Sequence, residues 1–563
     1  MARPEGCLAL LALLPLCSAV FYLPGAAPVD FKPYQQVKLY ASKLTSTKTQ
    51  VPYDFYSLPF CRHKHPHMEQ ENLGERLSGD KIESSVYKLH MKVPKACEVA
   101  CSRELKKAEA AAFQEAIDQD YRVHFIVDNL PVGMIMIADT GDRVFTRGFP
   151  VGFAEDDGVS KRYYLFNHLR IVIQYNDGHP PTDAFADTDS KIVGFRVEPY
   201  SIQHTWMGPL DKGTTVLDTC NAMVQPKHEP GSYMEIEGGV GVLFTYDVYW
   251  ERDLETEWSH RWDVYLTAKV DSKVHWFSIT NSTLIVLFLT VMIAMILVRT
   301  LRRDIAAYND PVEEAKEESG WKLVHADVFR PPRTLPMLFS VLVGSGAQLF
   351  YMSLLTLTFA LLGFLSPANR GSLITALILL YVFMGSAAGY CSSRVYKMFR
   401  GVEWKHNTLM TAFLFPGCVF AVYFVLNVAL WSEGSSGALP FSTFFTLLFL
   451  WFGVSVPLVF VGSFFGYKKE VVQHPVRTNQ IPRQVPPQPW FMHPALCIAF
   501  GGVLPFGAVS VECFFLMSSV WLHQIYYIFG FLFLVMLILI ATCAEITILL
   551  CYFQLVNEDY RWW

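Results

Sequence analysis

The strongest pattern in the chain is an uncharged apolar stretch, FSITNSTLIVLFLTVMIAMILV, at residues 277–298. A helix rises about 1.5 Å per residue, so this stretch reaches roughly 33 Å and can cross the hydrocarbon core of a bilayer. Arg299, Arg302 and Arg303 follow it directly. An apolar span with arginines clustered behind it predicts a transmembrane helix whose arginine end lies in the cytosol. The residues before the span are therefore expected to be luminal or extracellular.

More apolar segments follow this span, separated mostly by short polar stretches. They lie at about 340–364, 371–391, 408–430, 441–466, 493–516 and 525–553. Together with the first span they predict a polytopic α-helical membrane protein with six further transmembrane helices over 340–553. The pattern leaves a cytosolic loop at 299–339 and a cytosolic tail at 554–563. Pro416, Pro457 and Pro505 interrupt spans and are expected to kink them.

The part before the span has a different pattern. The runs at 123–138, 191–202 and 241–250 are rich in β-branched and aromatic residues, and polar and apolar positions partly alternate in them. Such runs predict strands. One helix is predicted over Glu104–Asp118, with Ser102 as its N-cap. We therefore expect an N-terminal β-rich luminal domain over residues 21–276, resembling a β-sandwich.

The first 20 residues fit a secretory signal peptide. Arg3 supplies a positive charge, the segment 8–16 is apolar, and the small residues at 17–19 suit cleavage. The alternative is an uncleaved anchor helix, which the short apolar run and Pro15 disfavour.

Composition and charge agree with this topology. The chain is 52% hydrophobic and only 17% charged, whereas soluble proteins carry about 25% charged residues. The predicted cytosolic loops hold 15 lysines and arginines, and the predicted luminal loops hold only Arg370. This bias follows the positive-inside rule. The net charge of -5, without a basic run interleaved with aromatic residues, argues against binding to nucleic acid.

Four cysteines lie in the predicted luminal domain after the signal peptide: Cys61, Cys97, Cys101 and Cys220. An even number in an oxidising compartment suggests two disulfides, with three possible pairings. The tract CRHKHPH at 61–67 resembles a short metal-binding sequence. It lacks the ligand spacing of a known site, and oxidation would remove Cys61 as a ligand, so we expect no metal there.

Two glutamates and two glycines stand out within the predicted spans. A carboxylate at membrane depth is costly, so Glu512 and Glu545 mark either an ion or proton path or a polar contact that holds the bundle together. Gly385 and Gly389 lie on one face of their helix and permit close helix approach. That face could pack within the bundle or receive the span of a client protein.

Motifs for chemistry are missing from the sequence. It contains no G-x-S-x-G, no H-E-x-x-H and no phosphate-binding G-x-x-x-x-G-K-[ST]. We therefore expect no enzyme, no catalytic residues and no cofactor.

Several ordered stretches resemble the transmembrane 9 superfamily, the nonaspanins, and most of all the branch with the longer ectodomain that contains members 2 and 4. They are FYLPG (21–25), ENLGE (71–75), RTLRRDIAAYN (299–309), GWKLVHADVFRPPR (320–333), LSPANRG (365–371), HPVRTNQIPRQ (474–484) and YYIFGFLFLV (526–535).

The resemblance implies a multi-pass protein of Golgi and endosomal membranes. Its implied partners are the lipid bilayer and other integral membrane proteins, including ones with glycine-rich spans, whose sorting and surface localisation it would assist. It also implies roles in adhesion and phagocytosis. The family continues through two further spans to a lysine-x-aspartate type signal read by coat proteins, whereas this chain ends at EDYRWW. We therefore expect a truncated form that lacks this signal for coat proteins. The competing hypothesis is a transporter or channel for an ion, lipid or small solute.

Overall fold

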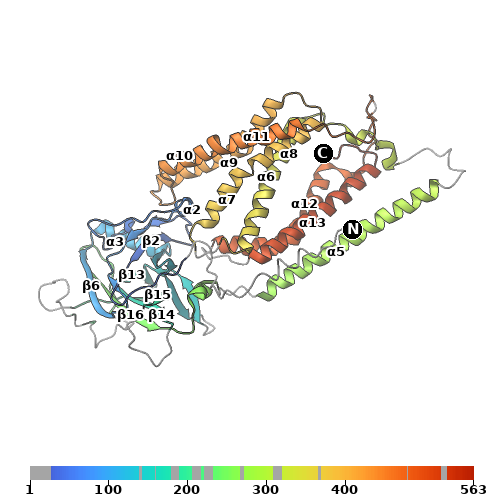
Figure 1. Cartoon of the computed structure of the whole chain (residues 1–563). Helices are drawn as coiled ribbons and strands as arrows, with labels where there is room; N and C mark the ends of the chain where they lie inside the picture. The colour runs from blue at the N-terminus through green and yellow to red at the C-terminus, as the bar shows by residue number, and fades with distance from the viewer. Residues whose placement is uncertain are drawn as a thin grey trace, which may run out of the picture.

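The chain folds into a β-rich N-terminal part at one end of a helical bundle (Figure 1). This computed structural model describes residues 27–137, 143–156, 158, 160–178, 189–205, 217, 219–220, 232–266, 272–308, 320–365, 369–478, 480–521 and 529–563. The predicted signal peptide lies outside these residues. We call the part between residues 27 and 266 the β-domain.

Two main sheets build the β-domain. The first runs in the order β10 (Arg143–Arg147), β9 (Gly133–Ile137), β15 (Lys191–Tyr200), β14 (His168–Asn176), β16 (Gly241–Arg252) and β6 (Lys95–Glu104). The second runs in the order β11 (Phe149–Pro150), β7 (Arg122–Val127), β2 (Leu39–Thr45) and β3 (Tyr53–Asp54), and β4 (Glu83–Ser84) and β8 (Leu130–Pro131) join it at the side.

Both sheets contribute to one hydrophobic core. Phe125 of the second sheet and Phe244 of the first are almost completely buried and belong to the same cluster. Along β15, Phe195 and Val197 are buried, whereas Gly194, Arg196 and Glu198 beside them are partly exposed. This alternation is what a strand with one face on a core requires. The predicted β-rich fold class of the N-terminal part is therefore confirmed.

The predicted helix over Glu104–Asp118 is wrong at its start. Ser102 lies within strand β6, where it pairs with Leu243 of β16, and the helix α3 covers only Lys107–Asp118. The ladder with β16 supplies hydrogen-bond partners for the backbone as far as Glu104, so the chain stays extended there. The helix begins where the Glu109 carboxylate accepts the Lys106 amide at 2.9 Å, as in a capping box.

The four cysteines form two disulfides, Cys61–Cys101 and Cys97–Cys220. Both join β6 to a distant segment, because Cys97 and Cys101 lie on that strand. This is one of the three pairings that the sequence left open.

Within the described residues, seven helical stretches are long and apolar enough to cross a membrane. They are Trp276–Arg303, Pro336–Leu361, Ser372–Met398, Trp404–Ser432, Phe441–Lys468, Pro494–Trp521 and Phe529–Val556. They confirm the predicted polytopic α-helical class. The first belongs to α5 (Ser272–Tyr308), which continues beyond the predicted end of the span at Val298.

The spans divide into two groups (Figure 1). The first group consists of α5, α12 (Pro494–Trp521) and α13 (Phe529–Val556). The second consists of α6 (Pro336–Leu361), α7 (Ser372–Phe383), α8 (Gly385–Met398), α9 (Trp404–Ser432), α10 (Phe441–Phe449), a π-helical turn η7 (Leu450–Ser455) and α11 (Val456–Lys468). Helix α13 packs against α6 and joins the groups.

Of the three prolines expected to kink spans, Pro416 and Pro505 lie inside the continuous helices α9 and α12. Pro457 lies at the start of α11, directly after the π-helical turn.

Candidate functional site

The two intramembrane glutamates lie in the three-helix group of α5, α12 and α13. The Glu512 side chain on α12 is only 1% exposed. One turn before it, the Ala508 carbonyl accepts a hydrogen bond of 2.5 Å from Ser282 of α5. The Glu545 carboxylate on α13 hydrogen-bonds to Thr290 of α5.

The two carboxylates therefore lie at different levels of this group. Ser282 and Thr290 are eight residues apart on α5, which corresponds to a rise of about 12 Å. The second oxygen of Glu545 is buried without a hydrogen-bond partner among the described residues. A buried polar atom without a partner is costly in a bilayer, so Glu545 is a candidate for proton or cation exchange.

A second polar cluster lies between α8, α9 and α11. The Asn407 amide donates to Ser392 Oγ at 3.0 Å and to the Tyr467 hydroxyl at 3.2 Å. Ser392 Oγ is 2.8 Å from Thr411 Oγ1. Asn407, Ser392 and Thr411 are buried. Such interhelical hydrogen bonds stabilise helix packing where no water is present to satisfy these groups.

Gly385 and Gly389 lie at the contact between α8 and α11. A Cβ atom on Gly389 would lie 2.1 Å from the Val459 carbonyl oxygen, and one on Gly462 would lie 1.9 Å from the Ser386 carbonyl oxygen. The glycines of both helices therefore let the two backbones touch. Of the two alternatives for the glycine face, this arrangement is packing within the bundle. Helix α11 covers the face, so it is not open to the span of a client protein.

A junction joins the β-domain to the bundle through backbone contacts. The short helix α2 (Leu73–Leu77) meets the start of α7. Asn72 Nδ2 donates to the Arg370 carbonyl at 2.7 Å, and the Gly74 amide donates to Thr375 Oγ1 at 3.0 Å. A Cβ atom on Gly74 would lie 2.0 Å from the Gly371 carbonyl oxygen.

Glu75 connects this junction electrostatically. Its carboxylate accepts a hydrogen bond of 2.8 Å from the backbone N–H of Asn72 and lies 3.5 Å from Arg370 Nε. Burial raises the pKa of the Glu75 carboxyl above its ordinary value, and the Asn72 amide and Arg370 only partly oppose that effect. Glu75 therefore caps α2 and at the same time pairs with the only basic residue in the predicted luminal loops.

A second contact of the junction lies at the loop between α9 and α10. Ser435 Oγ donates to the Pro52 carbonyl at 2.6 Å, and Ser436 Oγ donates to the Gly79 carbonyl at 3.0 Å. Next to Gly79, burial alone would raise the pKa of Asp80, but the ion pair with Lys43 at 3.0 Å outweighs burial and lowers it.

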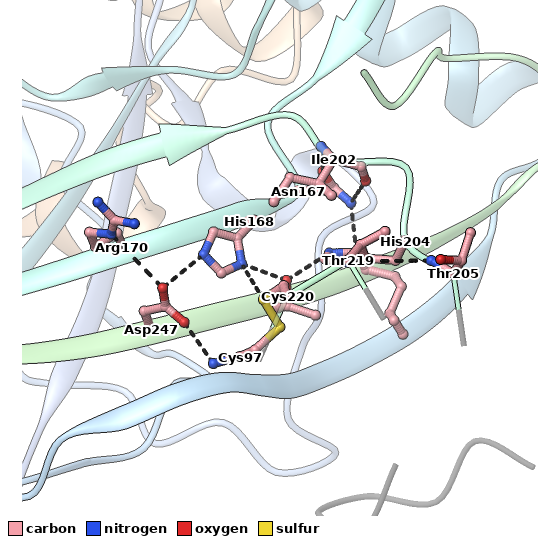
Figure 2. The surroundings of a disulfide bond; sticks show 12 residues. Cys97, Asn167, His168, Arg170, Ile202, His204, Thr205, Thr219, Cys220 and Asp247 are labelled. Carbon is pink, nitrogen blue, oxygen red and sulfur yellow. Dashed lines mark hydrogen bonds and ion pairs between the residues drawn. A yellow bond between two sulfur atoms is a disulfide. The ribbon is translucent and has the colours of Figure 1, made fainter. Parts of the chain in front are cut away.

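The Cys97–Cys220 disulfide lies beside a chain of buried polar side chains (Figure 2). His168 Nε2 is 3.3 Å from Asp247 Oδ2, and the other Asp247 oxygen accepts the Cys97 amide at 2.6 Å. Thr245 Oγ1 lies 2.8 Å from His168 Nδ1 and 2.9 Å from His204 Nε2. Because a hydroxyl has one proton, Thr245 donates to one ring and accepts from the other.

The surroundings shift the pKa values of two residues in this network of side chains, His204 and Asp247. Burial lowers the pKa of His204 to about 3, and repulsion from His168 adds to the effect. Burial would raise the pKa of Asp247, but its bond to His168 and the Cys97 amide outweigh burial and lower it.

Metal binding at this cluster would require a reduced disulfide. Ligand-type atoms of Cys97, His168 and Cys220 lie within 4.8 Å of one another. Since the two sulfurs bond to each other, no thiolate remains to bind a cation. The cluster therefore acts as a structural support of the disulfide.

Sequence reasoning did not find the junction or the buried histidine chain. The stretches ENLGE and LSPANRG were recognised only as family motifs, although they meet at Gly74 and Gly371. Two features of the sequence could have indicated the junction. They are the capping box at 72–75 and Arg370, the single basic residue of the predicted luminal loops. His168 and His204 gave no signal, because single histidines in strand-like sequence are common in cores.

Comparison with known proteins gives one consistent family. The family model of endomembrane protein 70 matches residues 52–563. Transmembrane 9 superfamily member 10 of Arabidopsis thaliana is 51% identical over 96% of this chain and 85% of the relative. Human transmembrane 9 superfamily members 2 and 4 are each 43% identical over 97% of this chain, covering 84% and 85% of the relatives. No solved structure matches the chain.

The contact between α8 and α11 can be tested with Gly389→Ala. The added methyl group would collide with the Val459 carbonyl, and we expect a loss of about 1–3 kcal/mol in stability. Thermal unfolding of the purified chain in detergent measures this loss. The matched control is Gly502→Ala on α12, where a Cβ meets nothing within 4 Å. Equal unfolding temperatures for the two variants would contradict the assignment.

The burial of His204 predicts that the free energy of unfolding of the β-domain depends on pH. The pKa of His204 is about 3 in the folded chain and 6.5 in the unfolded chain. Its contribution to stability is therefore complete above pH 6.5 and is lost as the pH falls from 6.5 toward 3. Between pH 7.5 and 5.5 the expected loss is about 1.4 kcal/mol. Hydrogen exchange of the β14 and β16 amides measures it.

In His204→Gln this part of the pH dependence should disappear, because glutamine does not titrate. The same decline in the variant as in the parent chain would show that another group is responsible.

Proposed function

The chain belongs to the transmembrane 9 superfamily and is a multi-pass membrane protein, and we propose that it assists the sorting and surface localisation of other integral membrane proteins. Its proposed location is the Golgi and endosomal membrane, with the β-domain in the lumen. Adhesion and phagocytosis would follow from the surface delivery of client proteins. The resemblance to the family motivates this role.

The observation that carries the proposal is the junction between the β-domain and the bundle. Contacts at Gly74, Glu75 and Ser436 hold the folded domain against the ends of the helices. A neighbouring membrane protein has both a span and a segment outside the bilayer. A protein in which a folded domain and a helical bundle form one continuous surface can contact both parts of such a neighbour at once.

The lipid-facing side of α5 supplies the membrane part of this surface. Leu287 and Val291 are 55% and 56% exposed there. Helix α5 packs against α12 and α13 on its other side. We propose that client spans approach α5 rather than the Gly385–Gly389 face, because α11 covers that face.

Site-specific crosslinking tests the sorting role. A photoreactive residue at position 287 or 291 should capture integral membrane proteins in cells, and a photoreactive residue at the buried Ser392 should not. The surface level of the captured proteins should fall severalfold when this chain is depleted. If α5 captures no membrane protein, or if the captured proteins reach the surface normally without this chain, the proposal is wrong.

A transporter or channel is the second candidate, and the buried Glu512 favours it. A carboxylate within a span that can exchange a proton is typical of ion and proton paths. The specific form of this candidate is proton movement along the group of α5, α12 and α13, past Glu512 and Glu545.

Proton flux into liposomes that contain the purified chain tests this candidate. If the candidate is correct, Glu512→Gln should reduce the flux at least about tenfold, because the amide cannot exchange a proton. Glu403→Gln, at the N-cap of α9 and outside the spans, should leave the flux unchanged. No flux in the parent chain would eliminate the transporter and leave the sorting role untouched.

A further inference from the structure

An open pocket of about 290 Å³ lies on the β-domain. Its walls come from β1 (Gln36–Val37), the start of β2, the segment 61–67 and the residues from the end of β4 almost to β5 (Leu89–His90). The lining residues are Gln36, Val37, Lys38, Leu39, Tyr40, His63, His65, His67, Ser84, Ser85, Tyr87 and Lys88.

The ionisable side chains of this lining are mostly basic. Lys38, between β1 and β2, and Lys88, just before β5, line the pocket, and three histidines enter it from one segment. The histidines occupy every second position, while Lys64 and Pro66 between them do not line the pocket. No aspartate or glutamate is among the lining residues. The arrangement therefore collects positive charge around an open volume.

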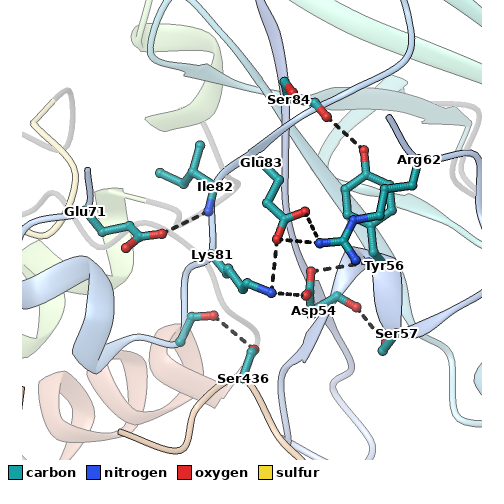
Figure 3. Close-up of polar contacts among 11 residues, drawn as sticks. Asp54, Tyr56, Ser57, Arg62, Glu71, Lys81, Ile82, Glu83, Ser84 and Ser436 are labelled. Atoms are coloured by element: carbon teal, nitrogen blue, oxygen red, sulfur yellow. Dashed lines mark hydrogen bonds and ion pairs between the residues drawn. The ribbon is translucent and has the colours of Figure 1, made fainter. Parts of the chain in front are cut away.

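Two carboxylates near the pocket, Glu83 and Glu98, are already paired with other cations. Glu83 lies 2.9 Å from Arg62 Nη2 and 3.0 Å from Lys81 Nζ (Figure 3). Glu98 lies 2.5 Å from Lys95. In the part of the chain that the structure describes, no ion pair joins Lys38 or Lys88 to a carboxylate. The positive charge of the two lysines is thus available to a ligand.

A metal ion fits this pocket poorly. A cation needs ligand atoms that converge on one point, and among the described residues only Cys97, His168 and Cys220 place three such atoms within 4.8 Å. His63 is also engaged, since its Nε2 lies 2.8 Å from the Ser85 carbonyl oxygen. A carbonyl can only accept, so His63 Nε2 donates there.

We propose that this pocket binds a tetrahedral oxyanion, such as a phosphate group. Four oxygens on one centre match donors that are spread around a volume, and lysine ammonium groups are common partners of phosphate. The Ser84 hydroxyl adds a neutral donor to the lining, whereas the Ser85 hydroxyl already donates to the Leu39 carbonyl at 2.9 Å. The group could belong to a soluble phosphorylated molecule or to a lipid headgroup, because the same chemistry recognises both.

Calorimetric titration of the full chain in phosphatidylcholine nanodiscs tests the proposal. Inorganic phosphate should bind, and Lys38→Gln and Lys88→Gln should each weaken binding about tenfold through the loss of a charge-assisted hydrogen bond. Lys64→Gln is the matched control, because Lys64 belongs to the same segment but does not line the pocket. Inorganic sulfate, which is also a tetrahedral oxyanion, should bind as well.

A second set of nanodiscs that contain phosphatidic acid identifies the source of the group. Weaker binding of inorganic phosphate in these discs indicates that the lipid headgroup occupies the pocket, and unchanged binding indicates a soluble ligand. Protection of Lys38 and Lys88, but not Lys64, from acylation by added phosphate provides a readout on the unmodified chain.

Three results would overturn the proposal. They are no binding of phosphate or sulfate, an equal loss of binding in Lys64→Gln, and binding of zinc through the three histidines without any binding of oxyanions.

Discussion

The placement of the β-domain on the bundle depends on a close approach between two backbones. Gly74 of the β-domain and Gly371 at the start of α7 are so near that a Cβ atom on Gly74 would lie 2.0 Å from the Gly371 carbonyl oxygen. Gly371 has a φ of 69°, a conformation that glycine adopts without strain. The contact places Glu75 beside Arg370 and the Gly74 amide on Thr375. The orientation of the β-domain on the bundle is therefore set by the shape of the backbone as much as by charge.

The same principle holds within the membrane part. Lipid tails are as apolar as leucine side chains, so helices in a bilayer gain little from hiding apolar surface from one another. Close backbone contact supplies the attraction instead, and Gly389 and Gly462 make it possible between α8 and α11. The hydrogen bonds of Asn407 add a directional contact next to this seam. Many large apolar side chains of the spans, Leu287 and Phe514 among them, are instead exposed on the outside of the bundle.

The elements that the sequence predicted are those decided by local composition. Apolar stretches of more than about 20 residues define spans wherever they occur, and the strands of the β-domain follow from β-branched runs. Ser102 was misplaced because its neighbourhood suits either a strand or a helix start, and only the ladder with β16 decides between them. The disulfide pairing, the junction at Gly74 and the histidine pocket all join segments far apart in the chain. Their geometry appears only when the sheets are assembled, although the pocket histidines themselves were conspicuous in the sequence.

The π-helical turn at Leu450–Ser455 determines which residues of α11 face α8. A π-turn accommodates an additional residue within a helix, which shifts the following residues by about 100° around the axis relative to an uninterrupted α-helix. The small residues Gly462 and Ser463, which face α8, would leave that contact if the turn reverted to α-helical winding. A one-residue deletion between residues 450 and 455 would thus rotate all of α11 about its axis relative to α8. The packing defect would appear two turns downstream, at the contact between α8 and α11, although no residue of that contact had been changed.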